Sequence, residues 1–446
     1  MMAEDIMSYT IYKNKNQTFM QVKSIMPALM GAMLLLVSCK KEVADVIVTD
    51  YESGNMPTAV TVTPNVAGIN SLVLFQLDDY DFNKMVAAGG VLSQQGAACS
   101  EVRVGESVVR NLDWFQYDQA AYVVAVPETD RHLASLQVCG LNDAVKHDYN
   151  NLHPGMEMCN LLLAGTNDGM NSAGVYIGVN VVPYGQMSTD GSTGDVNYKP
   201  ADGARYSKCE PLELVYLTRL VLDHATSLKD AEDIIKGTPW KDSPAMIKNG
   251  FQFHWLVCTA EGSFVCEFIN GKPQFIYARS TTAPDYGNLM TNFSNYLMAN
   301  GGNVQSHGAG YERFDILKQN YGKATPEQLA KLAFYSLMYT VDYNDPNYMW
   351  SEYASDKYTA QTLIGWKNDP ASRTGQLWDD FVQAYERNKA TYNWRELGYD
   401  TDRTRGTWYT AHSSIWNINT RELVLDIEEQ GTFAAKFDLK GNILAK

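Results

Sequence analysis

The sequence predicts an α+β fold in which strands and helices occur in separate blocks. Residues 251–278 contain three apolar runs separated by a Glu-Gly and an Asn-Gly turn, and such turns are typical of antiparallel hairpins. Helical periodicity instead occupies residues 212–222 and 228–235, one after the other. Because the helices do not alternate with strands one for one, layered α+β is favoured over a doubly wound parallel sheet.

The expected strands fall into three groups along the chain. Strand signals dominate residues 101–126 and 174–182, and they return in residues 413–444. The strands of the central meander are expected at 252–259, 263–269 and 274–278.

Helix boundaries are indicated by capping residues. Ser227 can cap the helix at 228–235, and Thr325 and Gln328 form a capping box around a proline at the first helical position. This second helix is expected to run to about residue 339, and another helical pattern covers about 375–389.

Composition narrows the classes of partner. The 446 residues are 45% hydrophobic and 20% charged, as in ordinary globular proteins. The net charge of -15 argues against nucleic acid or an anionic membrane surface as the main partner. The G-x-S-x-G, H-E-x-x-H, Walker and C-x-x-C motifs are all absent, so the sequence predicts no metal site.

The N-terminal region has the features of an export signal. Residues 25–37 are apolar, follow several lysines, and are too short to span a bilayer as a helix. They end in Leu-Val-Ser-Cys, which resembles a bacterial lipobox in which Cys39 is acylated. We therefore expect a lipoprotein signal peptide at 1–38, a polar tether at 39–63, and a location in the periplasm or on the cell surface. The alternative is an ordinary signal peptide with a coincidental cysteine.

Small residues precede Cys99, so a peptide bond can lie close to its thiol. If the bond between Ala98 and Cys99 were cut, Cys99 would carry both a nucleophile and an α-amine whose pKa of about 7.7–8.0 makes it a base at neutral pH. Arg110 would favour the thiolate, and Asp113 can hold the new ammonium. The alternative is that Cys99 is a buried core residue.

Several polar segments resemble, in order, the choloylglycine hydrolase family. This family includes bile salt hydrolases, penicillin V acylases and, more distantly, acid ceramidase-like N-acyl amidases. The resemblance rests on Cys99, Arg110-Asn111-Leu112-Asp113, the Asp-Gly-Met-Asn run after Asn167 with Asn180, Leu289-Met290-Thr291-Asn292, and Glu312-Arg313-Phe314.

The resemblance implies the four-layer αββα sandwich of N-terminal nucleophile hydrolases. It makes Cys99 the nucleophile and, through its α-amine, the base, while Arg110 and Asp113 orient and charge-balance that terminus. It further implies that Asn180 stabilises the oxyanion and that Asn292 holds the amine or the substrate amide.

Arg313 would then complete the polar network. Without Cys99, the two asparagines would be interpreted as turn formers and Arg313 as an exposed helix residue.

The implied reaction is hydrolysis of a linear, non-peptide amide through a thioester, without a metal or organic cofactor. The substrate is expected to be a small amphipathic N-acyl amide: a conjugated bile acid, a fatty N-acyl amine or amino acid, or phenoxyacetyl penicillin. Self-cleavage before Cys99 would leave residues 64–98 as a small subunit on an amidase domain of residues 99–446. We expect the two fragments to stay associated, the protein to form homo-oligomers, and the lipid anchor to be its one membrane attachment.

Two alternatives remain open at this point. The chain can be a surface lipoprotein that binds glycans on aromatic side chains, with Cys99 merely structural. It can also be a papain-like hydrolase that pairs Cys99 with His307 or His412 and is active without cleavage.

Overall fold

The computed structural model describes part of the chain. The described residues are 8–14, 17–23, 46–49, 59–69, 72–88, 98–114, 121–140, 162–183, 211–242, 251–301, 308–333, 370–372, 374–379, 409–427 and 433–444. They divide into two units, Met1–Val43 and Ala44–Lys446.

The first unit contains one antiparallel hairpin. Its strands are β1 (Ser8–Asn14) and β2 (Gln17–Lys23), with Ser8 opposite Lys23. The apolar stretch 25–37 and Cys39 lie outside the described residues, so the signal peptide and lipidation site stay predictions. No helix in the described part of the chain is long and apolar enough to cross a membrane.

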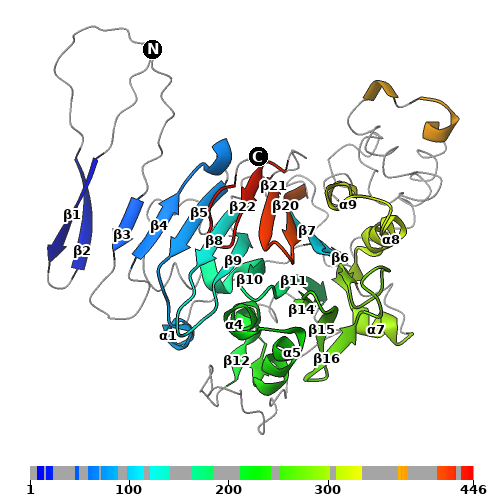
Figure 1. Ribbon diagram of the computed structural model, residues 1–446, viewed down its shortest axis with the longest axis horizontal. Helices are drawn as coiled ribbons and strands as arrows, with labels where there is room; N and C mark the ends of the chain where they lie inside the picture. The colour runs from blue at the N-terminus through cyan, green and yellow to red at the C-terminus, as the bar shows by residue number, and fades with distance from the viewer. Residues whose placement is uncertain are drawn as a thin grey trace. The chain divides into compact units, whose positions relative to one another are not determined.

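The second unit contains a ten-stranded and a six-stranded sheet (Figure 1). The order of the ten-stranded sheet is β16 (Lys272–Tyr277), β15 (Ser263–Ile269), β14 (Phe251–Cys258), β11 (Tyr176–Pro183), β10 (Thr166–Asn171), β9 (Ser135–Gly140), β8 (Ala121–Val126), β5 (Leu72–Leu77), β4 (Ala59–Thr63) and β3 (Val46–Thr49). The order of the six-stranded sheet is β17 (Leu289–Met290), β6 (Ala98–Val104), β7 (Ser107–Trp114), β20 (Tyr409–Asn417), β21 (Glu422–Ile427) and β22 (Ala435–Phe437). The meander β14–β15–β16 confirms the predicted hairpins.

The two sheets pack face to face through one apolar cluster. Val108 and Trp416 from the six-stranded sheet lie in the same buried cluster as Leu136, Met170 and Leu256 from the ten-stranded sheet. Face-to-face packing of this kind buries one side of each sheet and leaves the opposite side for helices.

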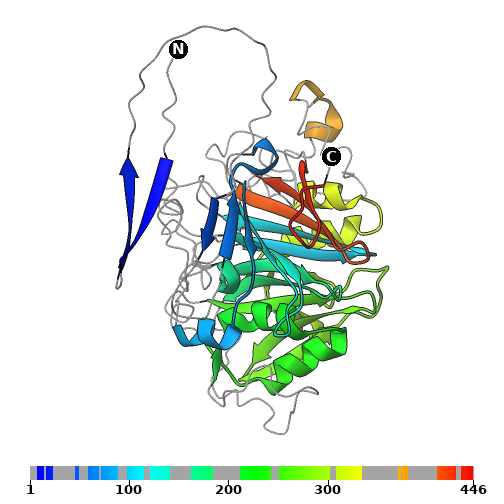
Figure 2. The same ribbon diagram turned by 60° about the vertical axis from the view of Figure 1, so that its left-hand side comes forward.

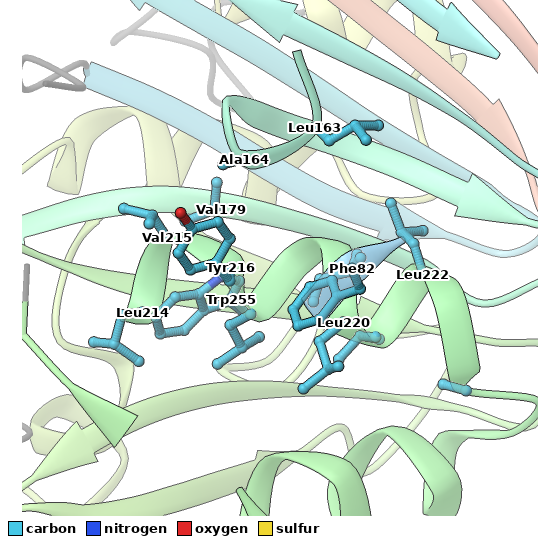
Figure 3. Close-up of a cluster of buried hydrophobic side chains, with 14 of the residues drawn as sticks. Phe82, Leu163, Ala164, Val179, Leu214, Val215, Tyr216, Leu220, Leu222 and Trp255 are labelled. Carbon is cyan, nitrogen blue, oxygen red and sulfur yellow. The ribbon is translucent and has the colours of Figure 1, made fainter. Parts of the chain in front are cut away.

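Helices cover both outer faces. Helices α4 (Leu217–His224) and α5 (Leu228–Gly237) lie against the ten-stranded sheet, where Val179 and Trp255 contribute to one core with Tyr216 and Leu220 (Figures 2 and 3). Helices α8 (Tyr311–Asn320) and α9 (Pro326–Leu332) pack on the six-stranded sheet through a separate core. The order helix, sheet, sheet, helix is the predicted four-layer αββα sandwich.

Local sequence sets the start of two helices as expected. The Ser227 hydroxyl accepts a hydrogen bond from the Asp230 N–H at the start of α5. The Thr325 and Gln328 side chains form the predicted capping box of α9.

The predicted start of the helix at residue 212 is wrong. Leu212–Glu213 is a short strand, β12, that pairs in parallel with β13 (Trp240–Lys241), and residues 214–216 form a 3-10 turn before α4. Apolar periodicity cannot distinguish these states because nearly every side chain from Leu212 to Leu222 is buried.

Strand β5, which precedes Cys99 in the chain, is part of the ten-stranded sheet. Strand β5 lies between β4 and β8, pairs with β8 in parallel, and buries Leu72 and Phe75 almost completely. Strands β3 and β4 fall within the predicted tether 39–63. Residues 46–49 and 59–63 of that segment therefore belong to the ten-stranded sheet and not to a tether. Strands as short as these are stabilised by their partners across the sheet, which the polarity of the local sequence does not reveal.

Candidate active site

Cys99 lies near the start of β6, and only 1% of its surface is exposed. Side chains alternate along a strand, so β6 presents Cys99 and Glu101 to the ten-stranded sheet and Ser100 to the helix layer. The neighbouring strand β7 divides its side chains in the same way, with Arg110 on the sheet side and Asp113 on the helix side. Polar groups therefore surround Cys99 on both faces of one sheet.

On the helix side, Arg313 of α8 forms a buried ion pair with Asp113. Its Nη1 is 2.9 Å from Asp113 Oδ2, and the same nitrogen donates to the Cys99 carbonyl at 2.8 Å and to the Ser100 hydroxyl at 2.7 Å. Asp113 Oδ1 accepts a hydrogen bond from the Thr410 hydroxyl at 2.7 Å. Arg313, itself paired with Asp113, thus holds the carbonyl group of the candidate nucleophile.

Gly310, which precedes α8, gives Arg313 the space it needs. Gly310 has a φ of 82°, and a Cβ there would lie 2.7 Å from Arg313 Nη2 and 3.0 Å from the Thr291 side chain. A residue with a side chain would be strained in that conformation and would also displace the guanidinium.

Asn292 contacts the backbone nitrogen of Cys99. Its Oδ1 accepts hydrogen bonds from the Cys99 N–H at 2.9 Å and from Arg313 Nη2 at 2.7 Å, and its Nδ2 donates to the Val181 carbonyl at 2.9 Å. All three hydrogen bonds fix the amide orientation, so an acceptor faces the Cys99 nitrogen.

On the sheet side, Arg110 contacts the thiol. Its Nη2 lies 3.5 Å from Cys99 Sγ and donates to the Val179 carbonyl at 2.9 Å. Its Nε donates to Glu101 Oε1 at 2.9 Å, and its Nη1 lies 3.3 Å from Asp168 Oδ1. One guanidinium is therefore shared by a thiol and two carboxyl groups.

Burial is the main influence on the pKa of Cys99 and of Glu101, whereas Asp168 differs. It raises the pKa of the Cys99 thiol to about 12, although Arg110 opposes this, and it raises the pKa of Glu101 to about 8. Burial alone would also raise the pKa of Asp168, but the charge of Arg110, the nearby His412 and a hydrogen bond from Ser414 outweigh it, and this pKa is lowered. The site thus holds one strongly acidic carboxyl and one weakly acidic carboxyl.

Asn180 on β11 is connected to the site through Thr291. Its Nδ2 donates to the Thr291 carbonyl at 3.2 Å, and its Oδ1 has no hydrogen-bond partner among the described residues. His254 Nε2 lies 2.8 Å from the same carbonyl, while His254 Nδ1 lies 3.0 Å from Glu267 Oε1. The other predicted residues form contacts with Cys99 or with each other. Asn180 instead contacts Thr291, which precedes Asn292 in the chain.

The sequence did not identify Glu101 or Asp168 as site residues. Asp168 accepts hydrogen bonds from the Ser414 hydroxyl and the Trp416 indole N–H, both at 2.6 Å. The available signal for Glu101 was its position two residues after Cys99, on the same face of a buried strand.

His412 does not pair with the thiol. It lies opposite Leu112 on one side of β7, and Cys99 lies opposite the same residue on the other side, so their Cα atoms are two strands or roughly 9–10 Å apart. His412 Nε2 is instead 3.9 Å from Asp168 Oδ1. His307, the other candidate partner, is outside the described residues.

The described side chains contain no group of three or more histidine, cysteine, aspartate or glutamate residues arranged to hold a metal ion.

Comparisons with known proteins find similarity in fold only. No family model and no curated protein sequence matches the chain. Among solved structures, the chain is similar to a mutant of the conjugated bile acid hydrolase from Clostridium perfringens, with 15% identity, a TM-score of 0.38, and coverage of 78% of this chain and 97% of that one. A second variant of that hydrolase matches with 13% identity, a TM-score of 0.36, and coverage of 74% and 90%. The penicillin V acylase from Agrobacterium tumefaciens matches with 14% identity, a TM-score of 0.32, and coverage of 74% and 82%.

Proposed function

We propose that this protein is an amidase that hydrolyses linear, non-peptide amides with Cys99 as its nucleophile. The observation that carries the proposal is that the nitrogen and the sulfur of Cys99 each contact a different polar side chain. Its nitrogen lies 2.9 Å from Asn292 Oδ1, and its sulfur lies 3.5 Å from Arg110 Nη2. A merely structural cysteine in an apolar core needs neither contact.

The proposed reaction begins after cleavage of the Ala98–Cys99 bond. The free α-amine of Cys99 takes the thiol proton, and the thiolate attacks the acyl carbonyl to form a tetrahedral intermediate. The amine then gives this proton to the departing amine as the carbon–nitrogen bond breaks and a thioester forms. Water hydrolyses the thioester, which releases the carboxylic acid and restores the thiol.

The neighbouring residues have distinct tasks in this mechanism. Asn292 Oδ1 accepts one N–H of the α-amine and thereby orients its lone pair. Arg110 favours the thiolate, and Asp113, held by Arg313, balances the charge that the amine gains as ammonium. Asn180 would donate to the oxyanion, and loss of one such donor typically costs about 2.7–4 kcal/mol of transition-state stabilisation.

Retention of the upstream fragment is supported by the sheet. Strands β3, β4 and β5 all precede the cut and form one end of the ten-stranded sheet, and β5 pairs with β8 and buries Leu72 and Phe75. Dissociation of the upstream fragment would therefore expose the edge of β8 and these apolar side chains. We expect the cleaved fragments to stay together until the protein is denatured, and separation by gel filtration without denaturant would contradict this.

Export and anchoring through Cys39 remain part of the proposal because of the lipobox-like sequence alone. Metabolic labelling with a radioactive fatty acid tests this: label is expected in the wild-type protein and not in Cys39→Ala.

The substrate class can be tested with a panel of N-acyl amides. We expect the purified protein to release free amine from at least one glycine- or taurine-conjugated bile acid, fatty N-acyl amine, N-acyl amino acid or phenoxyacetyl penicillin. Cys99→Ala should be inactive towards every compound, and Cys266→Ala, at another buried cysteine on β15, is the control that retains the nucleophile. Equal turnover by wild type and Cys99→Ala would overturn the proposal.

A further inference from the structure

The sheet side of the site contains more acid than base. Among the described residues, Arg110 is the one arginine or lysine that contacts the cluster, and it is shared by Glu101, Asp168 and the Cys99 thiol. His412 lies 3.9 Å from Asp168 Oδ1, and burial lowers its pKa, which favours the neutral imidazole. Glu101 and Asp168 are both completely buried, so water does not screen their charges.

Asp168 already balances the charge of Arg110. Its two oxygens accept hydrogen bonds from Arg110, Ser414 and Trp416, which is the environment of an ionised carboxylate. Any further anion beside Arg110 is therefore in excess.

Glu101 is held in place but poorly compensated. Beyond Arg110, its carboxyl group contacts the Tyr176 hydroxyl at 3.3 Å. It also lies directly against Gly178, where a Cβ would come within 2.3 Å of Glu101 Oε2. The charged or titratable groups that face it are Arg110 of β7, Asp168 of β10, Tyr176 of β11, Cys258 of β14, and Cys99 and Arg103 of its own strand.

Arg103 does not relieve the excess. Its side chain donates to the carbonyls of Gly105 and Ala260, at 3.2 and 3.5 Å, rather than to a carboxyl group. Among the described residues, Arg110 therefore remains the cation that contacts Glu101, Asp168 and the Cys99 thiol.

We propose that Glu101 and Cys99 compete for the single positive charge of Arg110, so that Glu101 stays protonated while Cys99 acts as a thiolate. The inference rests on the proposed role of Cys99 as nucleophile. Glu101 acts through Arg110 and not on the substrate, and is therefore a positioning residue that sets the acidity of the thiol.

The acidity of both groups agrees with this competition. After burial and Arg110, the next influence on the pKa of Glu101, which is raised to about 8, is the negative charge of Asp168. Glu101 in turn contributes to raising the pKa of the Cys99 thiol. Groups that interact this closely titrate as a coupled pair.

A thiolate titration tests the competition directly. The ultraviolet absorbance of the thiolate is followed against pH in the purified protein and in Glu101→Gln, and the matching Cys99→Ala protein is subtracted each time to isolate Cys99. Glutamine has the shape and neutrality of the protonated carboxyl group, so we expect the midpoint of Cys99 to fall by about one pH unit or more. Glu422→Gln, on β21 of the same sheet and paired with Lys436, is the matched control and should leave the midpoint unchanged.

An unchanged or higher midpoint in Glu101→Gln would overturn the inference. Failure of Glu101→Gln to fold at neutral pH would also count against it, because the proposed native state already has a neutral group there. The titration needs no substrate, so a shifted midpoint without amide hydrolysis would leave the inference standing and remove the proposed function. Amide hydrolysis with an unshifted midpoint would do the reverse.

The pH dependence of stability provides a second measurement. Because the pKa of Glu101 rises from 4.5 in the unfolded chain to about 8 in the folded one, ionisation favours unfolding between these values. The contribution of Glu101 to stability is full below pH 4.5, falls as pH rises towards 8, and stays lost above it. Glu101→Gln should therefore gain stability relative to wild type across this window, and a constant difference would contradict the proposal.

Discussion

The two faces of the β6–β7 strand pair differ in their balance of carboxyl groups and cations. On the helix side, Asp113 and Arg313 form a balanced pair of one carboxylate and one cation. On the sheet side, Arg110 faces both Glu101 and Asp168. Both sets are buried, so the difference lies in the count of charges and not in access to water.

This difference separates two requirements of the proposed reaction. The balanced side fixes the backbone of Cys99, because Arg313 holds its carbonyl and Asn292 its nitrogen. The acid-rich side contacts the thiol, where protonation must change during turnover. Cys99 therefore has a backbone fixed by one face and a thiol whose protonation is influenced by the other.

The largest expected effect is the loss of the balanced pair. Arg313→Leu would leave the Asp113 carboxylate buried without its cation and should lower the free energy of unfolding by about 3–5 kcal/mol. Denaturant unfolding in a Cys99→Ala background measures this without interference from self-cleavage. Adding Asp113→Asn should recover part of the loss, and a loss below about 1 kcal/mol would show that the pair is not the frame we describe.

Removal of the hydrogen bond to Asp113 should have the next largest effect. Thr410→Val keeps the side-chain shape but removes the hydroxyl that lies 2.7 Å from Asp113 Oδ1. Hydrogen bonds to charged groups contribute about 1.5–3 kcal/mol, and a loss of this size in the free energy of unfolding is expected. No measurable loss would indicate that the Asp113 carboxylate is not the ionised partner of Arg313.

On the sheet side, Gly178→Ala tests the close approach of Glu101. The new Cβ would lie 2.3 Å from Glu101 Oε2 and 2.5 Å from the Tyr176 hydroxyl, and overpacking of this kind costs about 1–3 kcal/mol. The penalty should shrink when Glu101→Ala is also present. Gly262→Ala is the control, since its nearest neighbour would be 3.5 Å away, and equal penalties for both glycines would contradict the contact.

The smallest expected effect is that of Tyr176→Phe, which tests whether the carboxyl group on the sheet side is neutral. Tyr176→Phe removes the hydroxyl that lies 3.3 Å from Glu101 Oε2. If Glu101 is neutral at pH 7, only an uncharged hydrogen bond is lost and the free energy of unfolding should fall by about 0.5–1.5 kcal/mol. A loss as large as that of Thr410→Val would mean that Glu101 is ionised.

Elements with strong local signals could be predicted from the sequence. The Asn-Gly turn set the β15–β16 hairpin, and Thr325 with Gln328 set the start of α9, because turn and capping chemistry act within a few residues. Strands β3 and β4 depend on pairing with β5 and, through it, β8. Their short apolar runs lie in a mostly polar segment, so the local sequence predicts a tether there.

The same distinction applies to the site. The family resemblance predicts that Cys99, Arg110, Asp113, Asn292 and Arg313 share a site, and the structure brings them into contact, while their roles stay a proposal. The importance of Glu101 could not be predicted, since it arises from Gly178 on β11 and Arg110 on β7, which only the folded sheets place around it.

The central claim, that Cys99 becomes an N-terminal nucleophile, is tested most directly by intact mass spectrometry under denaturing conditions. Purified wild type should yield two fragments whose masses place the cut between Ala98 and Cys99, while Cys99→Ala should remain one chain. If wild type also remains whole, no free α-amine exists at Cys99 and the amidase mechanism proposed here is wrong.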